Sequence, residues 1–323
     1  MKAAVMFQKG EMPQYADFPV PTVHDDDELL ISVKAAAIKH LDKSSASGKH
    51  YSTKNDPSQA KVIGGDGVGL LEDGTRVYAI GVSGMIAEKA VIEKSRMVPL
   101  PAGINDVTAA ALPNAVIGSA MGIRFRAGMK QGETVLINGA TGFTGKIAVQ
   151  IAKHYGAQKI IATGRNQESL QSLLTLGANE TVSVKQDDDT FVSQIRNIHS
   201  NTPIDVIIDY LWGHTAEMIL SALKGTGSFT HKTRFVSIGA VTGDIIQLSA
   251  ENLRSVDLQL SGSGLGSWTK DQVQKLFGEI LPEMLQLAAN KKLQVDTISV
   301  SLKDIQRLWD MDVPDGKRLV VTI

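Results

Sequence analysis

The sequence predicts an α/β protein in which a doubly wound parallel sheet of six strands is inserted into a β-rich domain. The first observation is the length of 323 residues, which suits two domains at about 100 to 200 residues each. The second is a change of pattern along the chain. Short strands come first, strand and helix patterns alternate from about residue 130, and short strands return at the end.

The two ends of the chain have the same β-rich character. Strands are predicted at residues 2–7, 29–38, 75–80 and 86–92, where β-branched residues are frequent and Gly, Pro and Asp separate the runs. A long helix is predicted over residues 270–290, followed by strands at 297–301 and 318–323. We therefore expect one discontinuous domain, residues 1–118 and 266–323, around an inserted domain of residues 119–265.

The inserted segment alternates strands with helices. Strands are predicted at residues 134–138, 159–163, 181–184, 205–209, 234–238 and 257–261. Helices are predicted between them at residues 144–155, 167–176, 191–198 and 215–223. Such alternation favours a parallel sheet with helices on both faces, and ligands of these sheets bind at the carboxyl ends of the strands.

Composition excludes several classes of function. The 33 basic and 34 acidic residues give a net charge of −1, which provides no electrostatic footprint for a nucleic acid. The chain has no Cys, which excludes disulfides, thiolate nucleophiles and Cys-rich zinc sites. The apolar run at residues 3–7 is too short for a signal peptide, and no charge-free stretch approaches about 18 residues. We expect a cytoplasmic protein that binds neither nucleic acid nor membrane.

A glycine-rich turn between the strand at 134–138 and the next helix is the sharpest signal. It matches G-x-G-x-x-G with Ala140 in the place of the first glycine. Gly142 lets the backbone approach a pyrophosphate, and Gly145 lets the helix pack closely on the strand, while the unpaired N–H groups of the helix start supply an anion site. We predict dinucleotide binding by Ala140, Thr141, Gly142, Phe143, Thr144 and Gly145.

The second strand of the alternating segment ends in Thr163, Gly164, Arg165 and Asn166, which we predict to contact the ribose of the coenzyme. An NAD enzyme has an acidic residue about 20 residues beyond the glycine turn, and no acid is present here. Arg165 is a fixed cation whose planar fork suits a 2′-phosphate, so NADPH is the predicted cofactor. The alternative is that Arg165 is a solvated surface residue.

Segments along the whole chain carry a resemblance to a known family: MKAAV, ELLISVKAAAIKHLD, GGDGVG, PAGINDVTAAALPNAV, KQGETVLINGATGFTGKIAVQIAKHYGA, VSIGAVTG and DGKRLVVTI. On these segments the chain resembles the medium-chain dehydrogenase/reductase superfamily, and in particular its zinc-independent, quinone-oxidoreductase-like branch. The resemblance implies a GroES-like catalytic domain interrupted by a Rossmann domain, with the active site in the cleft between them. It also places Ile238 and Gly239 in a later cofactor loop.

Zinc-dependent members of this superfamily hold a catalytic metal at positions that correspond here to Lys39, Gly65 and Asn114. None of these residues is a usable zinc ligand, so the resemblance implies a reaction without a metal. Hydride addition to an already activated acceptor needs no Lewis acid. We expect NADPH-dependent reduction of a small electrophilic substrate, a quinone or an α,β-unsaturated carbonyl. An enoyl-thioester (acyl-CoA) reductase and a non-enzymatic NADPH-binding protein are the alternatives.

The resemblance also implies catalytic residues. Lys39 either stabilises a developing oxyanion near the nicotinamide or pairs with Asp42 without a catalytic role. Tyr51 resembles a pocket tyrosine of the family, with one residue inserted before it; it either positions the carbonyl and donates a proton or only lines the loop. Asn114 is expected to form hydrogen bonds within the pocket floor. His40 and His50 are further candidate proton donors, although a histidine in such a stretch is more often a surface residue.

The segments that border the expected cleft depart from the family pattern. The connection between Gly69 and Gly74 is shorter than usual, and residues 49–61 are polar, so the sequence does not define the substrate more closely. The loop at residues 261–267 follows the last strand of the inserted sheet. In relatives that edge strand pairs with its copy in a second subunit, and the resemblance therefore implies a homodimer.

Overall fold

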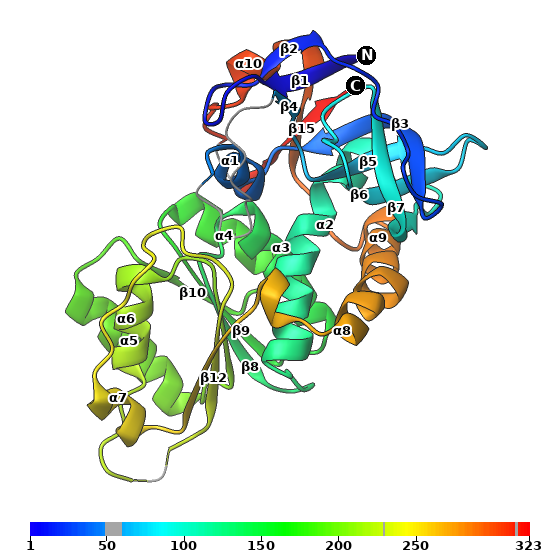
Figure 1. Cartoon of the computed structure of the whole chain (residues 1–323). Helices are drawn as coiled ribbons and strands as arrows, with labels where there is room; N and C mark the ends of the chain where they lie inside the picture. The colour runs from blue at the N-terminus through cyan, green and yellow to red at the C-terminus, as the bar shows by residue number, and fades with distance from the viewer. Residues whose placement is uncertain (49–59, 229, 314–315) are drawn as a thin grey trace. The chain divides into compact units, whose positions relative to one another are not determined.

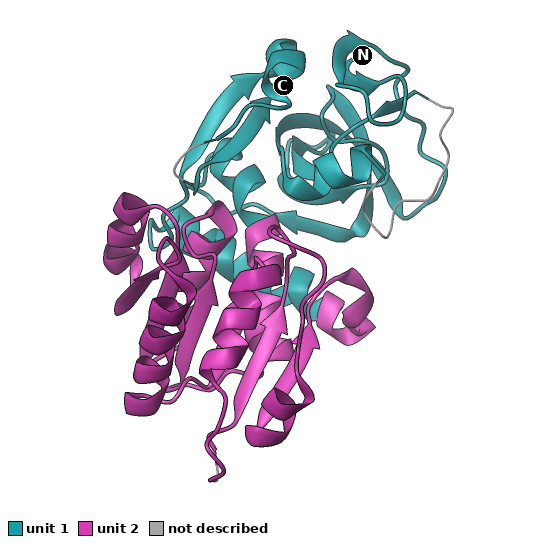
Figure 2. Ribbon diagram, turned by 90° about the vertical axis from the view of Figure 1, so that its left-hand side faces the viewer, with its two compact units in different colours: residues 1–113, 274–323 teal, residues 114–273 magenta. Residues whose placement is uncertain are grey.

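The computed structural model describes residues 1–48, 60–228, 230–313 and 316–323. These residues form two compact units, one of Met1–Pro113 with Gln274–Ile323 and one of Asn114–Val273 (Figure 2). The borders lie inside helix α2 (Asp106–Met121) and helix α8 (Lys270–Lys275). The predicted border after residue 118 falls in the same helix α2, and the one after residue 265 falls in the short turn Leu265–Ser267.

The first unit is β-rich, as predicted (Figure 1). Its large sheet has the order β14-β15-β3-β5-β6-β7, and β3 also pairs with β7, so that β3, β5, β6 and β7 close into a small barrel. The members of this sheet are β3 (Glu28–Ala37), β5 (Asp66–Leu70), β6 (Arg76–Gly81), β7 (Lys89–Pro99), β14 (Thr297–Ser301) and β15 (Arg318–Thr322). A second sheet, of order β2-β1-β4, consists of β1 (Lys2–Met6), β2 (Gln14–Asp17) and β4 (Lys61–Val62).

Several strands of the first unit differ from the prediction. Strand β5 was not predicted, because Gly67 and Gly69 weaken its pattern. A Cβ at either glycine would lie 2.8 Å from a backbone oxygen of β3, so the close approach of the two strands requires glycine. The strand predicted at residues 86–92 is β7, which begins at Lys89 and continues to Pro99. The prediction ended the strand too early because exposed polar side chains interrupt the apolar run after residue 92.

The helices of the first unit are α1 (His40–Ala46), α9 (Leu281–Ala289) and α10 (Ile305–Leu308). The predicted single helix at residues 270–290 is α8, a π-helical turn over Leu276–Ile280, and α9. Pro282 lies in the first turn of α9 and has no N–H to continue the ladder, which accounts for the change of register there. Helix α2 was not predicted, because Pro113 inside it is a helix breaker.

The second unit confirms the predicted doubly wound sheet. All its pairings are parallel and its order is β10-β9-β8-β11-β12-β13. The strands are β8 (Thr134–Asn138), β9 (Lys159–Gly164), β10 (Glu180–Ser183), β11 (Val206–Asp209), β12 (Thr233–Ser237) and β13 (Leu258–Gly262). The helices are α3 (Phe143–His154), α4 (Gln167–Leu176), α5 (Asp188–Asn201), α6 (Gly213–Ala222) and α7 (Ala250–Ser255), and a π-helical turn spans Gly122–Arg126. The strand order reverses between β8 and β11.

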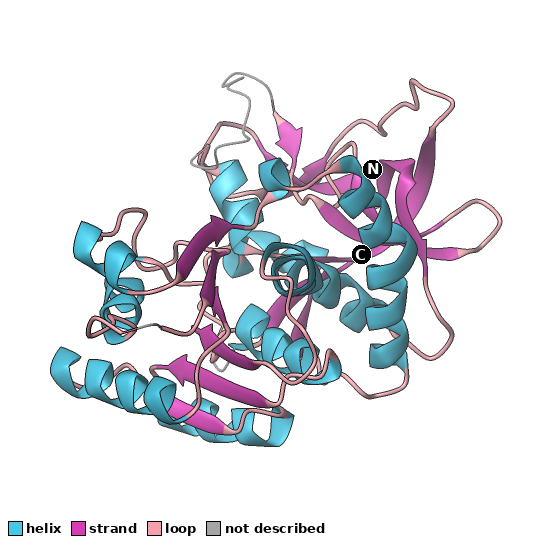
Figure 3. Ribbon diagram, turned by 90° about the horizontal axis from the view of Figure 1, so that it is seen from below, coloured by secondary structure: helices cyan, strands magenta, loops and turns pink. Residues whose placement is uncertain are grey.

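Helices cover both faces of this sheet (Figure 3). One face buries Leu136, Ile207 and Phe235 in a core with residues of α5 and α6. The alternate residues of the same strands, such as Val135 and Ile208, are equally buried and turn to the other face, where α3 packs on β8 and β9. The central strands β8 and β11 are buried on both faces and are largely apolar runs, which made them easy to predict. The predicted bounds of all six strands lie within one residue of the observed ones.

Candidate functional site

The glycine turn lies at the carboxyl end of β8, as predicted. β8 ends at Asn138, and α3 begins at Phe143. A Cβ on Gly145 would lie 2.4 Å from the carbonyl oxygen of Gly139, so only glycine lets the helix approach the turn this closely. Gly142 is different, because its φ of −76° suits any residue and an added Cβ would lie 3.8 Å from its nearest neighbour. The fold does not require glycine there, which fits a ligand that approaches the backbone.

The turn is held against the end of the neighbouring strand β9. The N–H of Ala140 donates to the carbonyl oxygen of Thr163 at 2.8 Å. A Cβ on Gly164 would lie 2.3 Å from Cγ2 of Thr141, so the side chain of Thr141 occupies the space that glycine leaves. The structure thus brings together two of the predicted groups of coenzyme-contacting residues, the turn and the end of β9.

A chain of buried hydrogen bonds crosses the carboxyl ends of three adjacent strands. Thr163 Oγ1 donates to Asn138 Oδ1 at 2.7 Å, and Asn138 Nδ2 donates to Asp209 Oδ1 at 2.7 Å. All three residues are fully buried. Asp209 was not among the predicted site residues, although its position as the polar last residue of an apolar strand was a usable signal. Burial raises the pKa of Asp209, and the hydrogen bonds that it accepts oppose this shift.

Asp209 also holds the loop that joins β11 to α6. Its carboxylate accepts hydrogen bonds from the N–H groups of Leu211 and Trp212, both at 3.0 Å. Trp212 has a φ of 56°, a left-handed conformation that is costly for a residue with a side chain. Thr242, in the loop after β12, donates to the carbonyl oxygens of Leu211 and Trp212 at 3.0 Å. The loop is therefore held in a strained conformation by groups on both sides.

The remaining predicted coenzyme contacts lie at the same edge of the sheet. Arg165 is exposed directly after β9. The side chain of Asn166 caps α4 and accepts a hydrogen bond from the N–H of Ser169 at 2.8 Å. Ile238 and Gly239 follow β12, and their N–H groups donate to the carbonyl oxygen of Asp209 at 2.8 and 3.3 Å.

The first unit contains a buried ion cluster around Lys39. The Lys39 ammonium forms ion pairs with Asp66 and, at 3.2 Å, with Asp42, and it donates to the carbonyl oxygen of Ala37 at 3.3 Å. The three N–H bonds of the ammonium therefore have three protein acceptors. The two carboxylates are fixed in turn, because Tyr78 donates to Asp66 at 2.6 Å and the N–H of Gly65 donates to Asp42 at 3.0 Å.

The charges of this cluster shift the pKa values of its members. Burial lowers the pKa of Lys39, but the two carboxylates outweigh burial, and the net shift is upward. Burial raises the pKa of Asp42 against the opposing effect of Lys39, and burial with the charge of Asp66 raises the pKa of Tyr78 well above its usual range. Burial lowers the pKa of Arg318, which is buried in the same unit, to about 10. Asp66 and Tyr78 are members that the sequence did not indicate.

The other predicted catalytic residues have different outcomes. Tyr51 and His50 lie outside the described residues. Asn114 is half-buried on α2, in the second unit. The pKa of His40 is lowered by burial and by the charges of Arg318 and Lys43, which favours a neutral imidazole. Among residues 1–48, 60–228, 230–313 and 316–323, no three His, Cys, Asp or Glu side chains form a group that could hold a metal ion.

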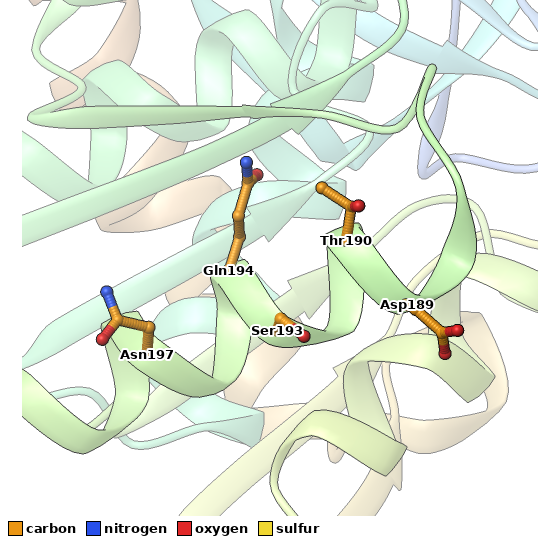
Figure 4. A pocket seen from close by; sticks show the side chains of 5 residues that line it. All are labelled: Asp189, Thr190, Ser193, Gln194 and Asn197. Atoms are coloured by element: carbon orange, nitrogen blue, oxygen red, sulfur yellow. The ribbon is translucent and has the colours of Figure 1, made fainter.

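The second unit has a shallow pocket on its surface (Figure 4). Its lining side chains all come from α5: Asp189, Thr190, Ser193, Gln194 and Asn197. None belongs to the predicted site, and α5 packs on the sheet through its opposite, apolar side. None of the helices in the described parts of the chain has the length and apolar character needed to cross a bilayer.

Known proteins resemble this chain over its full length. A family model described as zinc-binding dehydrogenase matches residues 144–283. A probable NADPH-dependent quinone reductase of Emericella nidulans is 25% identical over 354 residues, covering 96% of each chain, and a quinone oxidoreductase of Sus scrofa is 26% identical over 287 residues, covering 85% of this chain and 84% of its own. The crystal structure of a quinone oxidoreductase of Thermus thermophilus covers 100% of both chains with a TM-score of 0.82 at 24% identity.

The order of the parallel sheet, the glycine turn and these matches together indicate the class of the protein. The chain resembles the medium-chain dehydrogenase/reductase superfamily. Within that superfamily it is similar to quinone reductases and quinone oxidoreductases, the branch that its sequence had indicated, and it shares its fold with a solved quinone oxidoreductase.

Proposed function

We propose that this protein is an NADPH-dependent reductase that transfers a hydride, without a metal, to a quinone or an α,β-unsaturated carbonyl. The observation that carries the proposal is the glycine turn at the point where the strand order reverses, which is where dinucleotides bind in sheets of this kind. The names of the relatives, quinone reductase and quinone oxidoreductase, support the choice of substrate.

The residues of the second unit fit the coenzyme. The backbone of residues 140–145 would bind the pyrophosphate, and Arg165 would bind the 2′-phosphate. Residues 163–166 would border the ribose, and Ile238 and Gly239 would contact the coenzyme from the loop after β12. NADPH, when bound, supplies the hydride. The chain's own part is to bind and orient this donor beside the acceptor.

In the first unit we propose a supporting role for the Lys39–Asp42 pair. Every N–H bond of the Lys39 ammonium already has a protein acceptor, which favours the paired alternative over direct contact with a substrate oxygen. Lys39 also stands where zinc-dependent relatives have a metal ligand, and an ammonium repels a cation. Tyr51 is proposed to position the carbonyl or to donate a proton, and Asn114 to form hydrogen bonds in the pocket floor.

The test of the function is NADPH oxidation, followed by absorbance, with three acceptors. We expect turnover with 9,10-phenanthrenequinone and 1,4-benzoquinone. Turnover with crotonyl-CoA alone would instead support an enoyl-thioester reductase. Binding of NADPH with no turnover of any acceptor would support a non-enzymatic protein, and a stoichiometric metal required for turnover would contradict the metal-free reaction.

Arg165 provides a test of the coenzyme choice. The variant Arg165→Ala removes the proposed partner of the 2′-phosphate, so KM for NADPH should rise by roughly ten-fold while KM for NADH stays nearly unchanged. Steady-state kinetics with both coenzymes measure this. An equal rise for both would show that Arg165 does not read the 2′-phosphate.

We further propose that the protein is a cytoplasmic homodimer. Strand β13 is the edge of the parallel sheet in the described structure, and Leu253 and Leu265, on either side of it in the sequence, are 48% and 57% exposed. An open edge with apolar neighbours favours pairing with a second copy.

A further inference from the structure

Two cations follow neighbouring strands at the carboxyl edge of the parallel sheet. In the register of β9 and β10, Ser183 lies opposite Gly164, and the N–H of Val184 donates to the carbonyl oxygen of Gly164 at 2.9 Å. Arg165 comes directly after Gly164, and Lys185 comes directly after Val184. Adjacent strands are about 4.8 Å apart, so the two backbones that carry these cations leave the sheet side by side.

Both cations are available to a ligand. Arg165 and Lys185 are exposed, and neither forms an ion pair with another residue in the described parts of the chain. Two acidic residues near Lys185 in the sequence are engaged elsewhere: Asp187 caps α5 at Thr190, and Asp188 contacts His214 at 2.8 Å.

The opposite end of the same two strands is different. There Lys159 of β9 forms an ion pair with Glu180 of β10 at 2.8 Å. The cation at the amino edge is therefore compensated by the protein. The two cations at the carboxyl edge, where ligands of such sheets bind, are not.

We infer that Lys185 is a second cation for the 2′-phosphate of NADPH and acts together with Arg165; this inference rests on the proposed function. A phosphate monoester carries a charge of about −1.5 to −2 at neutral pH, which one guanidinium does not balance. Arg165 supplies a planar fork, and Lys185 supplies a point charge on a flexible stem that can adjust its position. Two residues would then select NADPH over NADH: Arg165, which follows β9, and Lys185, which follows β10.

The experiment compares Lys185→Gln, Arg165→Gln, the double variant and Lys159→Gln with the wild type. Lys159→Gln is the matched control, because it removes the same charge from the same pair of strands at the other edge. Titration calorimetry gives Kd for NADPH and NADH at low and high salt. Lys185→Gln should weaken NADPH binding by about five- to tenfold and leave NADH binding within about twofold. The double variant should bind NADPH no better than NADH.

Several results would overturn the inference. Lys185→Gln could bind NADPH as the wild type does, it could weaken both coenzymes equally, or Lys159→Gln could have the same effect. These results differ from failure of the proposed function, in which the wild type itself binds neither coenzyme. A weaker salt dependence of NADPH binding in Lys185→Gln than in the wild type would support the inference independently.

Discussion

Asp209 is a buried carboxylate without an ion-pair partner among the described residues, and it ends the chain of hydrogen bonds that joins the ends of three strands. Asn138 and Asp209 are 71 positions apart in the sequence. Periodicity identifies each as the last residue of a strand, but only the strand order places the two strand ends next to each other. For the same reason Asp42 was a candidate partner of Lys39 from its spacing, while Asp66, 27 positions away, was not.

The variant Asp209→Asn tests this residue. An amide at this position presents N–H groups to the N–H groups of Leu211 or Trp212, so the stability should fall by about 1 to 3 kcal/mol. The released loop should change the fluorescence of Trp212 and weaken NADPH binding. Fluorescence and calorimetry measure both effects. Normal NADPH affinity with an altered Trp212 signal would show that the loop does not contribute to the coenzyme site.

Lys39 gives a second prediction at this scale. The variant Lys39→Met removes the ammonium that forms ion pairs with two buried carboxylates, and the free energy of unfolding should fall by about 3 to 5 kcal/mol. Adding Asp42→Asn and Asp66→Asn to the Lys39→Met variant should restore part of the lost free energy of unfolding. The control Lys2→Met removes the exposed pair with Asp17 and should leave the free energy of unfolding nearly unchanged, because solvent screens this pair. Urea unfolding gives these values.

The same cluster predicts a pH dependence. The pKa of Lys39 is raised above its ordinary 10.5, so its stabilisation is present below that pH and is lost as pH rises through the folded pKa. The raised pKa of Tyr78, ordinarily 10.0, acts in the same direction. Wild-type stability should therefore fall above about pH 10, and Lys39→Met should show a smaller slope. If the free energy of unfolding fell equally steeply with pH in both proteins, Lys39 would not be the source of the pH dependence.

The position of the glycine turn and the bounds of α3 were predicted from the sequence to within one residue. The turn has one glycine that the packing needs, Gly145, and one that it does not need, Gly142. The motif alone does not separate these roles, because both positions are simply glycine in the pattern. The separation comes from the distances to Gly139 in the folded turn.

Two alanine variants test this difference. Gly145→Ala places a methyl group against the turn backbone and should reduce stability by about 1 to 3 kcal/mol. Gly142→Ala should leave the free energy of unfolding nearly unchanged, because its methyl group lies 3.8 Å from its nearest neighbour, but it should weaken NADPH binding by crowding the proposed approach of the pyrophosphate. Urea unfolding and calorimetry separate the two effects. Unchanged NADPH affinity in Gly142→Ala would show that the ligand does not approach there.

At the scale of the whole molecule, the open edge of β13 predicts a dimer. Light scattering after size exclusion should give about twice the chain mass of 34.6 kDa. Placing a charge on the edge strand with Gln259→Arg, at an exposed position of β13, should shift the protein toward the monomer. A wild type that is monomeric at micromolar concentration would contradict the prediction.

Local pattern and residue chemistry were enough for the class of fold, the strands of the parallel sheet and the glycine turn, because a strand buried on both faces and a turn before a helix each leave a continuous signature in the chain. The barrel strand β5, helix α2, the partner Asp66 and the role of Asp209 required the folded chain. Strand β5 depends on the close backbone approach at Gly67 and Gly69, and helix α2 accommodates a proline that local pattern reads as a break. Asp66 and Asp209 meet their buried polar partners only when segments far apart in sequence come together in the fold.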